Sequence, residues 1–272
     1  MNKMNIKHII ATMNNSEDIN EFIEKRNIKT GAVITNQGYK EGKINYGNYL
    51  WIDSKQRGLS NSRNESLDNV KDCDVVMIAD DDIVYKDDYI DTVNEAYKKY
   101  PDADIITFLI TVAGGKSDRI DSKKPIKHNK KTILSIGSNE VTFKLKSIND
   151  SGLRFDNRFG LGSGKFISGE ENVFLNEAMK KRLKMYHYPV VIADHPINDL
   201  SNGHWNEKMI YTKGAFFRNY SGVFAYMFAI LFWLLKQKNI DNNIGFVRYI
   251  KLWRRGMIDE YNSRRYRNEK EN

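Results

Sequence analysis

The chain has 272 residues, of which 40% are hydrophobic and 29% are charged, and its mean hydropathy is −0.60. These values are typical of a soluble globular protein with one large domain, or with one domain and an appendage. The single cysteine, Cys73, excludes an intramolecular disulfide and a cysteine-based zinc site, and the first residues hold no apolar stretch of signal-peptide length. We therefore expect a protein of the reducing cytoplasm.

The net charge of +8 at pH 7 is concentrated near the C-terminus. Residues 213–272 contain twelve Lys/Arg and five Asp/Glu, a net charge of +7, which leaves +1 for residues 1–212. A basic segment of this kind can face nucleic acid or anionic lipid. The apolar segment beside it, described below, favours lipid.

Strands and helices are predicted to alternate over the first 110 residues. Strands are expected at 6–12, 31–35, 75–79 and 104–110. Helices are expected at 17–26, from a capping-box motif at Ser62 and Glu65 to about Val70, and from Asp87 or Asp88 to Pro101. This alternation predicts an α/β fold with a mostly parallel, Rossmann-like sheet flanked by helices.

The middle of the chain is less regular. The elements expected there are, in order, a mobile surface loop at 114–131, a half-exposed strand at 140–146, a glycine-rich loop at 159–165, a helix from Glu170 or Glu171 to about Leu183, and a short strand at 190–193.

The most informative feature is an apolar run, Val75–Ala79, that ends in three consecutive carboxylates, Asp80, Asp81 and Asp82. A short run that is apolar throughout predicts a strand buried on both faces of a sheet. Three like charges at its carboxyl end are costly unless a cation or solvent relieves them, and ligands of open α/β sheets bind at that end. We expect a divalent metal ion that holds a phosphorylated ligand. A solvated turn is the alternative.

Residues 221–235 form an apolar segment without a charge. As a helix, this segment spans about 22 Å, less than the roughly 30 Å hydrocarbon core of a bilayer. Residues 244–255 follow, with apolar and basic residues at helical spacing. An apolar helix beside a basic amphipathic one predicts contact with a membrane surface through residues 213–272. A helix hairpin that closes the core and a true membrane span are the alternatives.

Six motifs occur in the order found in family 2 glycosyltransferases of the GT-A fold. They are Ala-Thr-Met-Asn-Asn-Ser at 11–16, Gly58–Asn64, Asp80–Asp82, Phe155–Gly160, Gly169–Leu175 and His195-Pro196. The chain resembles that family over residues 5–205. The resemblance implies a GT-A catalytic domain at 1–210, followed by a helical, basic tail at 211–272.

The resemblance also implies the reaction. A sugar would pass with inversion from a nucleotide-sugar donor, expected to be UDP-linked, to a hydroxyl group of a glycan or lipid-linked acceptor. Enzymes of this kind assemble bacterial surface polysaccharides. By the same resemblance, Asp82 and His195 ligate Mn²⁺ or Mg²⁺, which neutralises the diphosphate leaving group. His204 is the alternative histidine ligand, and Asp80 and Asp81 face the ribose or the sugar.

A general base must accept the proton of the acceptor hydroxyl. Glu171 matches the base position of the family, and Glu170 is the alternative, although the family pattern there is Gly-Glu-Asp and this chain has Gly-Glu-Glu. An acid at a helix N-terminus can also serve only to complement the helix dipole.

Five residues match positions that contact the nucleotide in the family. Thr12 and Met13 match the segment beside the base and ribose, and Arg63 and Asn64 match a contact to the base or diphosphate. Asn36 stands where many relatives carry an acid that contacts the base. For Arg63, a solvated helix charge is the alternative.

The predicted function is therefore that of a metal-dependent, hexosyltransferase-like glycosyltransferase at the inner face of the cell membrane, with no nucleic acid as partner. Two alternatives stay open. A nucleotidyltransferase on a similar sheet would need a glycine-rich, basic loop after the first strand, but residues 11–16 contain neither a glycine nor a basic residue. A non-catalytic, membrane-docked scaffold with a GT-A fold is the other.

Overall fold

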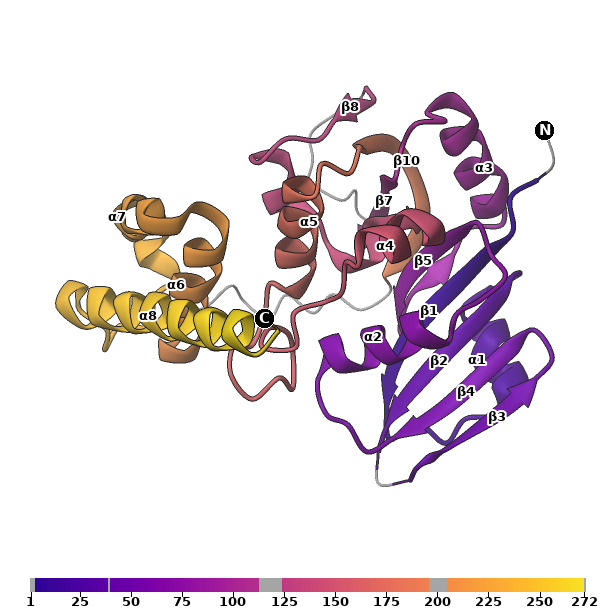
Figure 1. The fold of residues 1–272 in the computed structure, drawn as a ribbon, viewed down its shortest axis with the longest axis horizontal. Coiled ribbons are helices and arrows are strands. Elements are labelled where there is room, and N and C mark those ends of the chain that lie inside the picture. Colours follow the sequence, from indigo (N-terminus) through magenta and orange to yellow (C-terminus); the bar gives the residue numbers. More distant parts are fainter. Residues whose placement is uncertain (1–2, 39, 113–123, 196–204, 272) are drawn as a thin grey trace.

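The sheet predicted by the alternating pattern is present. The computed structural model describes residues 3–38, 40–112, 124–195 and 205–271, the last five of these by backbone only. In this part of the chain, ten strands form one mixed sheet in the order β3-β4-β2-β1-β5-β9-β7-β10-β6, with β8 paired to β10 (Figure 1). The strands are β1 (Ile6–Met13), β2 (Gly31–Gln37), β3 (Gly42–Tyr46), β4 (Tyr49–Ser54), β5 (Val75–Asp80), β6 (Val84–Tyr85), β7 (Ile105–Val112), β8 (Ile126–Lys127), β9 (Val141–Lys144) and β10 (Met185–His195).

Helices cover both faces of this sheet. The N-terminal part carries α1 (Ile19–Lys25), α2 (Leu59–Asn69), α3 (Tyr89–Lys99), α4 (Leu145–Ser151) and α5 (Glu170–Lys180). One buried cluster contains apolar residues of α1 and α3, and the other contains those of α2, α4 and α5. Alternate residues of β5 belong to the two clusters. Met77 packs in the cluster with α1 and α3, and Ile78 packs in the cluster with α2, α4 and α5. The strand is therefore buried on both faces, as its apolar sequence predicts.

Two parts of the sheet differ from the sequence prediction. The hairpin of β3 and β4 was not expected, because β3 is exposed along its whole length and lacks the apolar alternation of a strand. The strand expected to be half-exposed at 140–146 is β9, and it is buried in the middle of the sheet. It runs antiparallel between β5 and β7, where Phe143 lies opposite both Val76 and Ile105.

Three boundaries also differ. The capping-box prediction is wrong, because α2 begins at Leu59 after Gly58 (φ 110°), and the Ser62 N–H donates to the Gly58 carbonyl at 3.1 Å. α5 ends at Lys180 instead of Leu183, and β10 is longer than the strand expected at 190–193. Of the loop expected at 114–131, residues 114–123 lie outside the described residues.

Three further helices, α6 (Glu207–Ser221), α7 (Ala225–Lys236) and α8 (Phe246–Glu271), lie together at the left of Figure 1. Their buried residues belong to the same cluster as those of α5. α6 and α8 approach closely where each carries a glycine. A Cβ at Gly214 would lie 2.0 Å from the Trp253 carbonyl oxygen, and one at Gly256 would lie 1.9 Å from the Tyr211 carbonyl oxygen.

Residues 207–239 are long and apolar enough to span a membrane by length and composition. However, Gly222 (φ 64°) ends α6 after Ser221, and α6 buries Phe216 and Phe217 inside the protein. α7 has 12 residues and is about 18 Å long at 1.5 Å per residue, short of the roughly 30 Å needed. The stretch is therefore two shorter helices.

The glycine contact between α6 and α8 predicts that Gly214→Ala destabilises the protein. The added methyl group would overlap the backbone of α8, and overpacking of this kind costs about 1–3 kcal/mol. The free energy of unfolding, measured by urea titration, should fall accordingly. Gly245→Ala is the control, because its Cβ would meet nothing within 4 Å. Equal stability of the two variants would contradict the close approach of the helices.

Candidate active site

Asp80, at the end of β5, is held by neighbouring side chains. Arg63 on α2 donates to its Oδ1 at 2.9 Å, and Asn139 donates to its Oδ2 at 2.9 Å. The Asn139 Oδ1 accepts from the Asp80 N–H at 2.8 Å, and the Ser138 hydroxyl lies 3.5 Å from Oδ2. These contacts fix the direction in which the carboxylate triplet leaves the sheet.

Arg63 links α2 to two acids from distant parts of the chain. Its side chain is 1% exposed, and it donates to Glu170 Oε1 at 3.0 Å as well as to Asp80. Burial opposes the charge of the guanidinium, but the two carboxylates outweigh this effect and raise its pKa. The alternative of a solvated helix charge is wrong. Because the NH1 and NH2 groups both serve protein carboxylates, the geometry favours a positioning role over the expected contact with the nucleotide.

Thr12 and Met13 end β1 beside the triplet. The Thr12 hydroxyl donates to Asp81 Oδ2, and Arg26 Nε donates to the Asp81 carbonyl oxygen at 2.6 Å. Met13 is 58% exposed. Asp81 is thus fixed from two sides, while the Met13 side chain is accessible to a ligand.

Asp82 and His195 form the pair best suited to a metal ion. The His195 Nε2 lies 3.1 Å from Asp82 Oδ2, and Asp82 Oδ1 is buried without a hydrogen-bond partner in the described structure. The pKa of Asp82 is raised above its ordinary value, mainly by burial. His195 opposes this shift, and the charges of Asp80 and Asp81 add to it. His204, the alternative ligand, lies outside the described residues.

This pair is too small to enclose a metal by itself. Among the described residues, no group of three His, Cys, Asp or Glu side chains is arranged to hold one. Mg²⁺ is commonly bound through one or two carboxylates, with water and substrate phosphates completing its shell. The unpartnered oxygen of Asp82 and the nearby imidazole therefore fit a metal that arrives with a diphosphate.

Glu170 and Glu171 begin α5, but their side chains have different surroundings. Glu170 is buried and bonded to Arg63, whereas the Glu171 carboxylate accepts a hydrogen bond from its own backbone N–H. Burial and the charge of Glu170 raise the pKa of Glu171 to about 8, against the opposing charges of Arg63 and Lys213. A raised pKa near the working pH suits a general base. The geometry favours Glu171 over Glu170.

α6 contributes to this part of the site. The Ile167 N–H donates to Thr212 Oγ1 at 3.1 Å, and Gly169, which precedes α5, faces the ring of Phe216. Between these contacts lies Lys213. Its pKa is lowered, because the effect of burial outweighs the opposing charges of Glu171 and Glu170. Sequence analysis assigned Lys213 to the tail, and nothing in its spacing connects it with residue 171.

A cavity of about 410 Å³ opens beside the carboxyl ends of β1, β2 and β4. Its lining includes Asn36, Tyr46, Trp51 and Asp53. Asn36 is engaged by the protein, because its Nδ2 donates to Asp53 Oδ1 at 2.8 Å and to the Asn15 carbonyl at 3.0 Å. Asp53, which sequence analysis missed, places an acid beside Asn36. Its signal was present: Tyr49–Ile52 is an apolar run ending in an aspartate, as at Asp80.

Asn64 lies apart from this cavity. It donates to the Phe155 carbonyl at 2.9 Å and to Asn157 Oδ1 at 2.8 Å, and its own Oδ1 accepts from the Phe155 N–H. Its side chain therefore holds the loop that carries the Phe155–Gly160 motif. A contact between Asn64 and the nucleotide stays a prediction.

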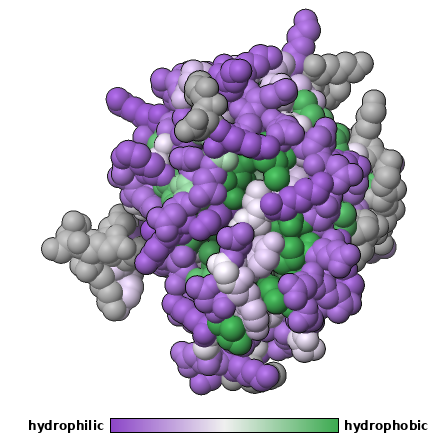
Figure 2. Space-filling model, turned by 90° about the vertical axis from the view of Figure 1, so that its right-hand side faces the viewer, coloured by the Kyte–Doolittle hydropathy of each residue, from purple (hydrophilic) through white to green (hydrophobic). Residues whose placement is uncertain are grey.

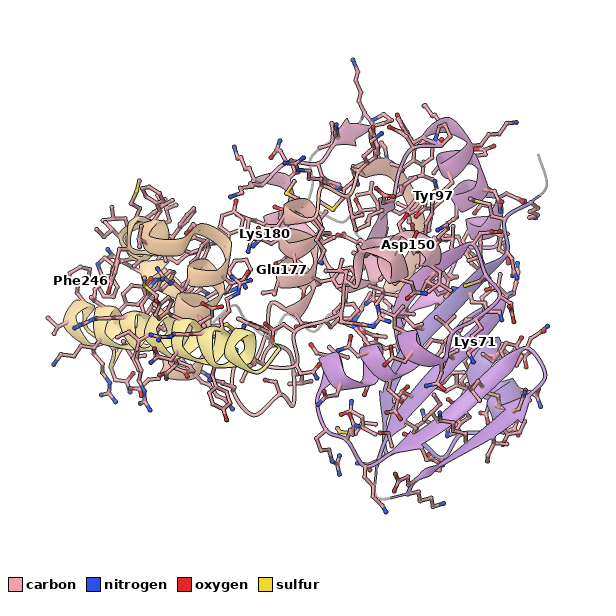
Figure 3. The ribbon with its side chains drawn as sticks, viewed as in Figure 1. Lys71, Tyr97, Asp150, Glu177, Lys180 and Phe246 are labelled. Carbon is pink, nitrogen blue, oxygen red and sulfur yellow. The ribbon has the colours of Figure 1, made fainter. Side chains whose placement is uncertain are left out.

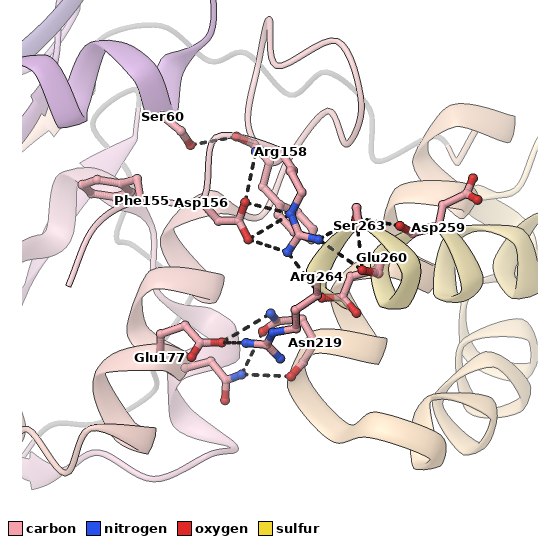
Figure 4. Close-up of polar contacts among 12 residues, drawn as sticks. Ser60, Phe155, Asp156, Arg158, Glu177, Asn219, Asp259, Glu260, Ser263 and Arg264 are labelled. Carbon is pink, nitrogen blue, oxygen red and sulfur yellow. Dashed lines mark hydrogen bonds and ion pairs between the residues drawn. The ribbon is translucent and has the colours of Figure 1, made fainter. Parts of the chain in front are cut away.

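Two polar groups join this part of the protein to the last helix (Figure 4). Arg158 forms an ion pair with Asp156 at 2.6 Å and with Glu260 of α8 at 3.4 Å. Glu177, on α5, pairs with Arg264 of α8 at 2.5 Å. In Figure 3, Glu177 and the neighbouring Lys180 lie on the side of α5 that faces the C-terminal helices. The helix that begins with Glu170 and Glu171 is thereby tied to the tail at its other end.

No family model matches this sequence, and no curated protein does. Its structure, however, is similar to solved structures of S. aureus TarS. One superposes with a TM-score of 0.56 at 10% identity and covers 95% of this chain but 43% of that TarS chain. The structure of TarS residues 1–349 superposes with a TM-score of 0.52 at 10% identity and covers 96% of this chain and 72% of that chain. The complex of this fragment with UDP-GlcNAc superposes with a TM-score of 0.50 at 11% identity and covers 96% of this chain and 73% of that chain.

The TarS structures are glycosyltransferase structures. The chain has a GT-A-like glycosyltransferase fold. At these identities, the likeness shows the fold alone, and the chain spans less than half the length of the longer TarS chain. In this GT-A-like fold, the carboxylate triplet, the pair Asp82–His195 and the start of α5 lie at the carboxyl edge of the sheet, where α/β proteins bind ligands.

The buried bridge predicts that Arg63→Met strongly destabilises the fold. It would leave Glu170 as an uncompensated buried charge, which costs about 3–5 kcal/mol, and would remove the arginine partner of the partly exposed Asp80. Urea unfolding measures the loss. Arg154→Met is the control, because its pair with Asp68 is exposed and exposed pairs contribute about 0–1 kcal/mol. Equal effects of the two substitutions would show that the bridge has no special role.

Proposed function

We propose that the protein is a metal-dependent, inverting glycosyltransferase of family 2 that uses a nucleotide-sugar donor. The single observation that carries the proposal is the buried, unpartnered oxygen of Asp82 beside His195, on a sheet with the GT-A-like fold. Asp82 and His195 would hold Mn²⁺ or Mg²⁺. When bound, the metal would shield the charge of the departing nucleotide diphosphate.

The nucleoside part is assigned to the cavity beside Asp53. Asp53 Oδ1 already accepts from Asn36 Nδ2 and from Trp51 Nε1 at 3.1 Å, but a carboxylate can accept about four hydrogen bonds. A base with a ring N–H, as in uracil, complements this acceptor, whereas the bare ring nitrogen of cytosine would repel it. The complex of TarS with UDP-GlcNAc supports a UDP-linked donor.

Glu171 is assigned as the general base. Its carboxylate would take the proton from an acceptor hydroxyl as that oxygen forms a bond with the anomeric carbon. On the opposite side, the bond from that carbon to the diphosphate oxygen breaks, which inverts the configuration. Arg63 and Lys213 set the charge around Glu171. The acceptor is proposed to be a glycan or a lipid-linked sugar, met at the cytoplasmic face of the membrane.

The proposal is tested by a screen of nucleotide-sugars for release of the nucleotide diphosphate in the presence of Mn²⁺. Asp82→Asn should lower the rate at least about a hundredfold, because the charge that holds the metal is lost. Asp88→Asn, at an exposed aspartate on the same segment, is the control. If neither donor turnover nor donor binding is found, and Asp82→Asn leaves the cellular function intact, the protein is a scaffold.

A second prediction follows from the raised pKa of Glu171. Between its ordinary pKa of 4.5 and the folded value of about 8, the folded protein retains a proton that the unfolded chain releases. The free energy of unfolding therefore falls as the pH rises through this interval. Glu171→Gln removes this loss, so its Tm should exceed that of the wild type near pH 8 and approach it near pH 5.

The same variant should lose activity, since removal of a general base costs about 10²–10⁴-fold in rate. In the wild type, kcat/KM should rise with pH towards 8. Glu24→Gln, at an exposed position of α1, should change neither quantity. A wild-type rate that falls over this interval, or a Glu171→Gln variant of full activity, would exclude Glu171 as the base.

A further inference from the structure

α7 has an unusual distribution of side chains for a surface helix. It buries two small residues, Ala225 and Ala229, against α8, where Trp253 Nε1 and the Tyr249 hydroxyl donate to their carbonyl oxygens at 3.2 and 3.1 Å. Phe228, Phe232 and Trp233 also pack against the core, but the other large apolar residues of α7, together with Phe224 just before it, are exposed. They form what we term the α7 face, which consists of Phe224, Met227, Ile230, Leu231, Leu234 and Leu235.

The α7 face is continuous. Residues 227, 230, 231, 234 and 235 follow the i, i+3, i+4, i+7, i+8 spacing of one side of a helix. Their side chains are 46–68% exposed. A contiguous exposed apolar patch on this scale marks an interaction site in soluble proteins.

The beginning of α8 extends this surface. Phe246 packs against Trp233 with ring centroids 5.2 Å apart, yet it remains 46% exposed, and Val247 beside it is 67% exposed. Figure 3 shows Phe246 at the end of α8 that is farthest from the sheet. A hollow of about 470 Å³ lies here, lined by Gly245 and by residues 246–248 and 251.

Basic residues surround the apolar ones. Residues 236–255 contain six Lys/Arg and one acid. Lys236, Lys238 and Lys251 are exposed, and no ion pair joins them to an acid within the described part of the chain. Arg248 pairs with Glu207. Figure 2 shows the opposite end of the molecule, where the hydrophobic residues among those described lie in small groups between hydrophilic ones.

We propose that the α7 face and the start of α8 bind the surface of a membrane rich in anionic phospholipid. The large apolar side chains would enter the boundary between headgroups and acyl chains, and Lys236, Lys238 and Lys251 would meet the lipid phosphates. α7 would lie along the membrane because it is too short to span it. This contact does not depend on the proposed sugar transfer.

The charge distribution selects lipid from the other occupants of an apolar face. A second copy of the chain would bring the same lysines against these lysines, which is unfavourable for a self-complementary contact. Nucleic acid would account for the lysines but not for six outward-facing large apolar residues. Anionic lipid matches both the apolar face and its rim.

Flotation of the full chain with vesicles tests this proposal. The protein should float with vesicles of equimolar phosphatidylglycerol and phosphatidylcholine and much less with phosphatidylcholine alone. Leu234→Ser/Leu235→Ser should reduce the bound fraction at least tenfold on the anionic vesicles, because two largely exposed leucines lose their burial in lipid. Lys236→Gln/Lys238→Gln should reduce it about tenfold, and this loss should vanish at high salt.

Two matched controls separate this surface from general stickiness. Leu161→Ser removes a leucine that is 72% exposed outside the C-terminal helices. Lys71→Gln/Lys98→Gln removes two exposed lysines. Lys71 lies away from the C-terminal helices in Figure 3, and Lys98 belongs to α3, which lies away from them in Figure 1. Both variants should float like the wild type. Unchanged Tm values show that each variant is folded, as expected for exposed positions.

Three outcomes would overturn the proposal. The first is a wild-type protein that does not float with anionic vesicles. The second is an equal loss of binding in the control variants. The third is a dimer in sedimentation experiments without lipid that Leu234→Ser/Leu235→Ser converts to a monomer, which would make a second copy the occupant of the face. Deletion of residues 213–272 is unsuitable as a test, because it also exposes the core that Trp253 and Phe217 fill.

Discussion

The buried arginine at position 63 is the interaction on which the arrangement of the site depends. Five carboxylates, three at the end of β5 and two at the start of α5, converge at one edge of the sheet. Like charges this close resist ionisation unless cations lie among them. Arg63 is placed between one member of each group, 2.9 Å from Asp80 and 3.0 Å from Glu170. Among the described residues, neither Asp82 nor Glu171, the two acids proposed to do chemistry, forms an ion pair with a lysine or arginine.

α5 carries this arrangement to the rest of the molecule. Its first residues belong to the site, and Asn176 and Glu177 further along bond to Asn219 of α6 and Arg264 of α8. The loop before α5 rests on Thr212 and Phe216 of α6. α6 and α8 therefore contact α5 near both of its ends and hold the helix that carries the candidate base Glu171. Within the described chain, α7 makes no such contact and is largely exposed.

Much of the fold could be predicted from local sequence. The uniformly apolar run before Asp80 identified β5, and the spacing of strands and helices identified a mostly parallel sheet. β3 could not be recognised, because an exposed edge strand such as Gly42–Tyr46 needs no apolar pattern. β9 was assigned to the wrong environment, because its alternating sequence does not reveal that it enters the centre of the sheet as an antiparallel strand.

The site was less predictable, since its main contacts join distant residues. Arg63 and Glu170 are 107 positions apart, and only the folded chain shows that the arginine serves two protein acids. Asp53 was missed with its strand. For α7, the sequence indicated an apolar helix beside basic residues, but it did not show which side of the helix faces solvent. That orientation is fixed in the folded chain, where Tyr249 and Trp253 donate hydrogen bonds to the carbonyl oxygens of Ala229 and Ala225.

The pairing of α8 with earlier segments has a consequence for the order of events during synthesis. Arg158 and Glu177 are translated long before Glu260 and Arg264, their partners in α8. Until α8 has left the ribosome, Arg158 has only Asp156 and Glu177 only Lys180 as an ion-pair partner among the described residues. Phe217 of α6 is not yet stacked on Trp253. A chain arrested before α8 would leave apolar side chains of α6 uncovered and would be a target for chaperones and proteases. The sheet and the acidic centre can therefore form before the C-terminal helices have finished packing.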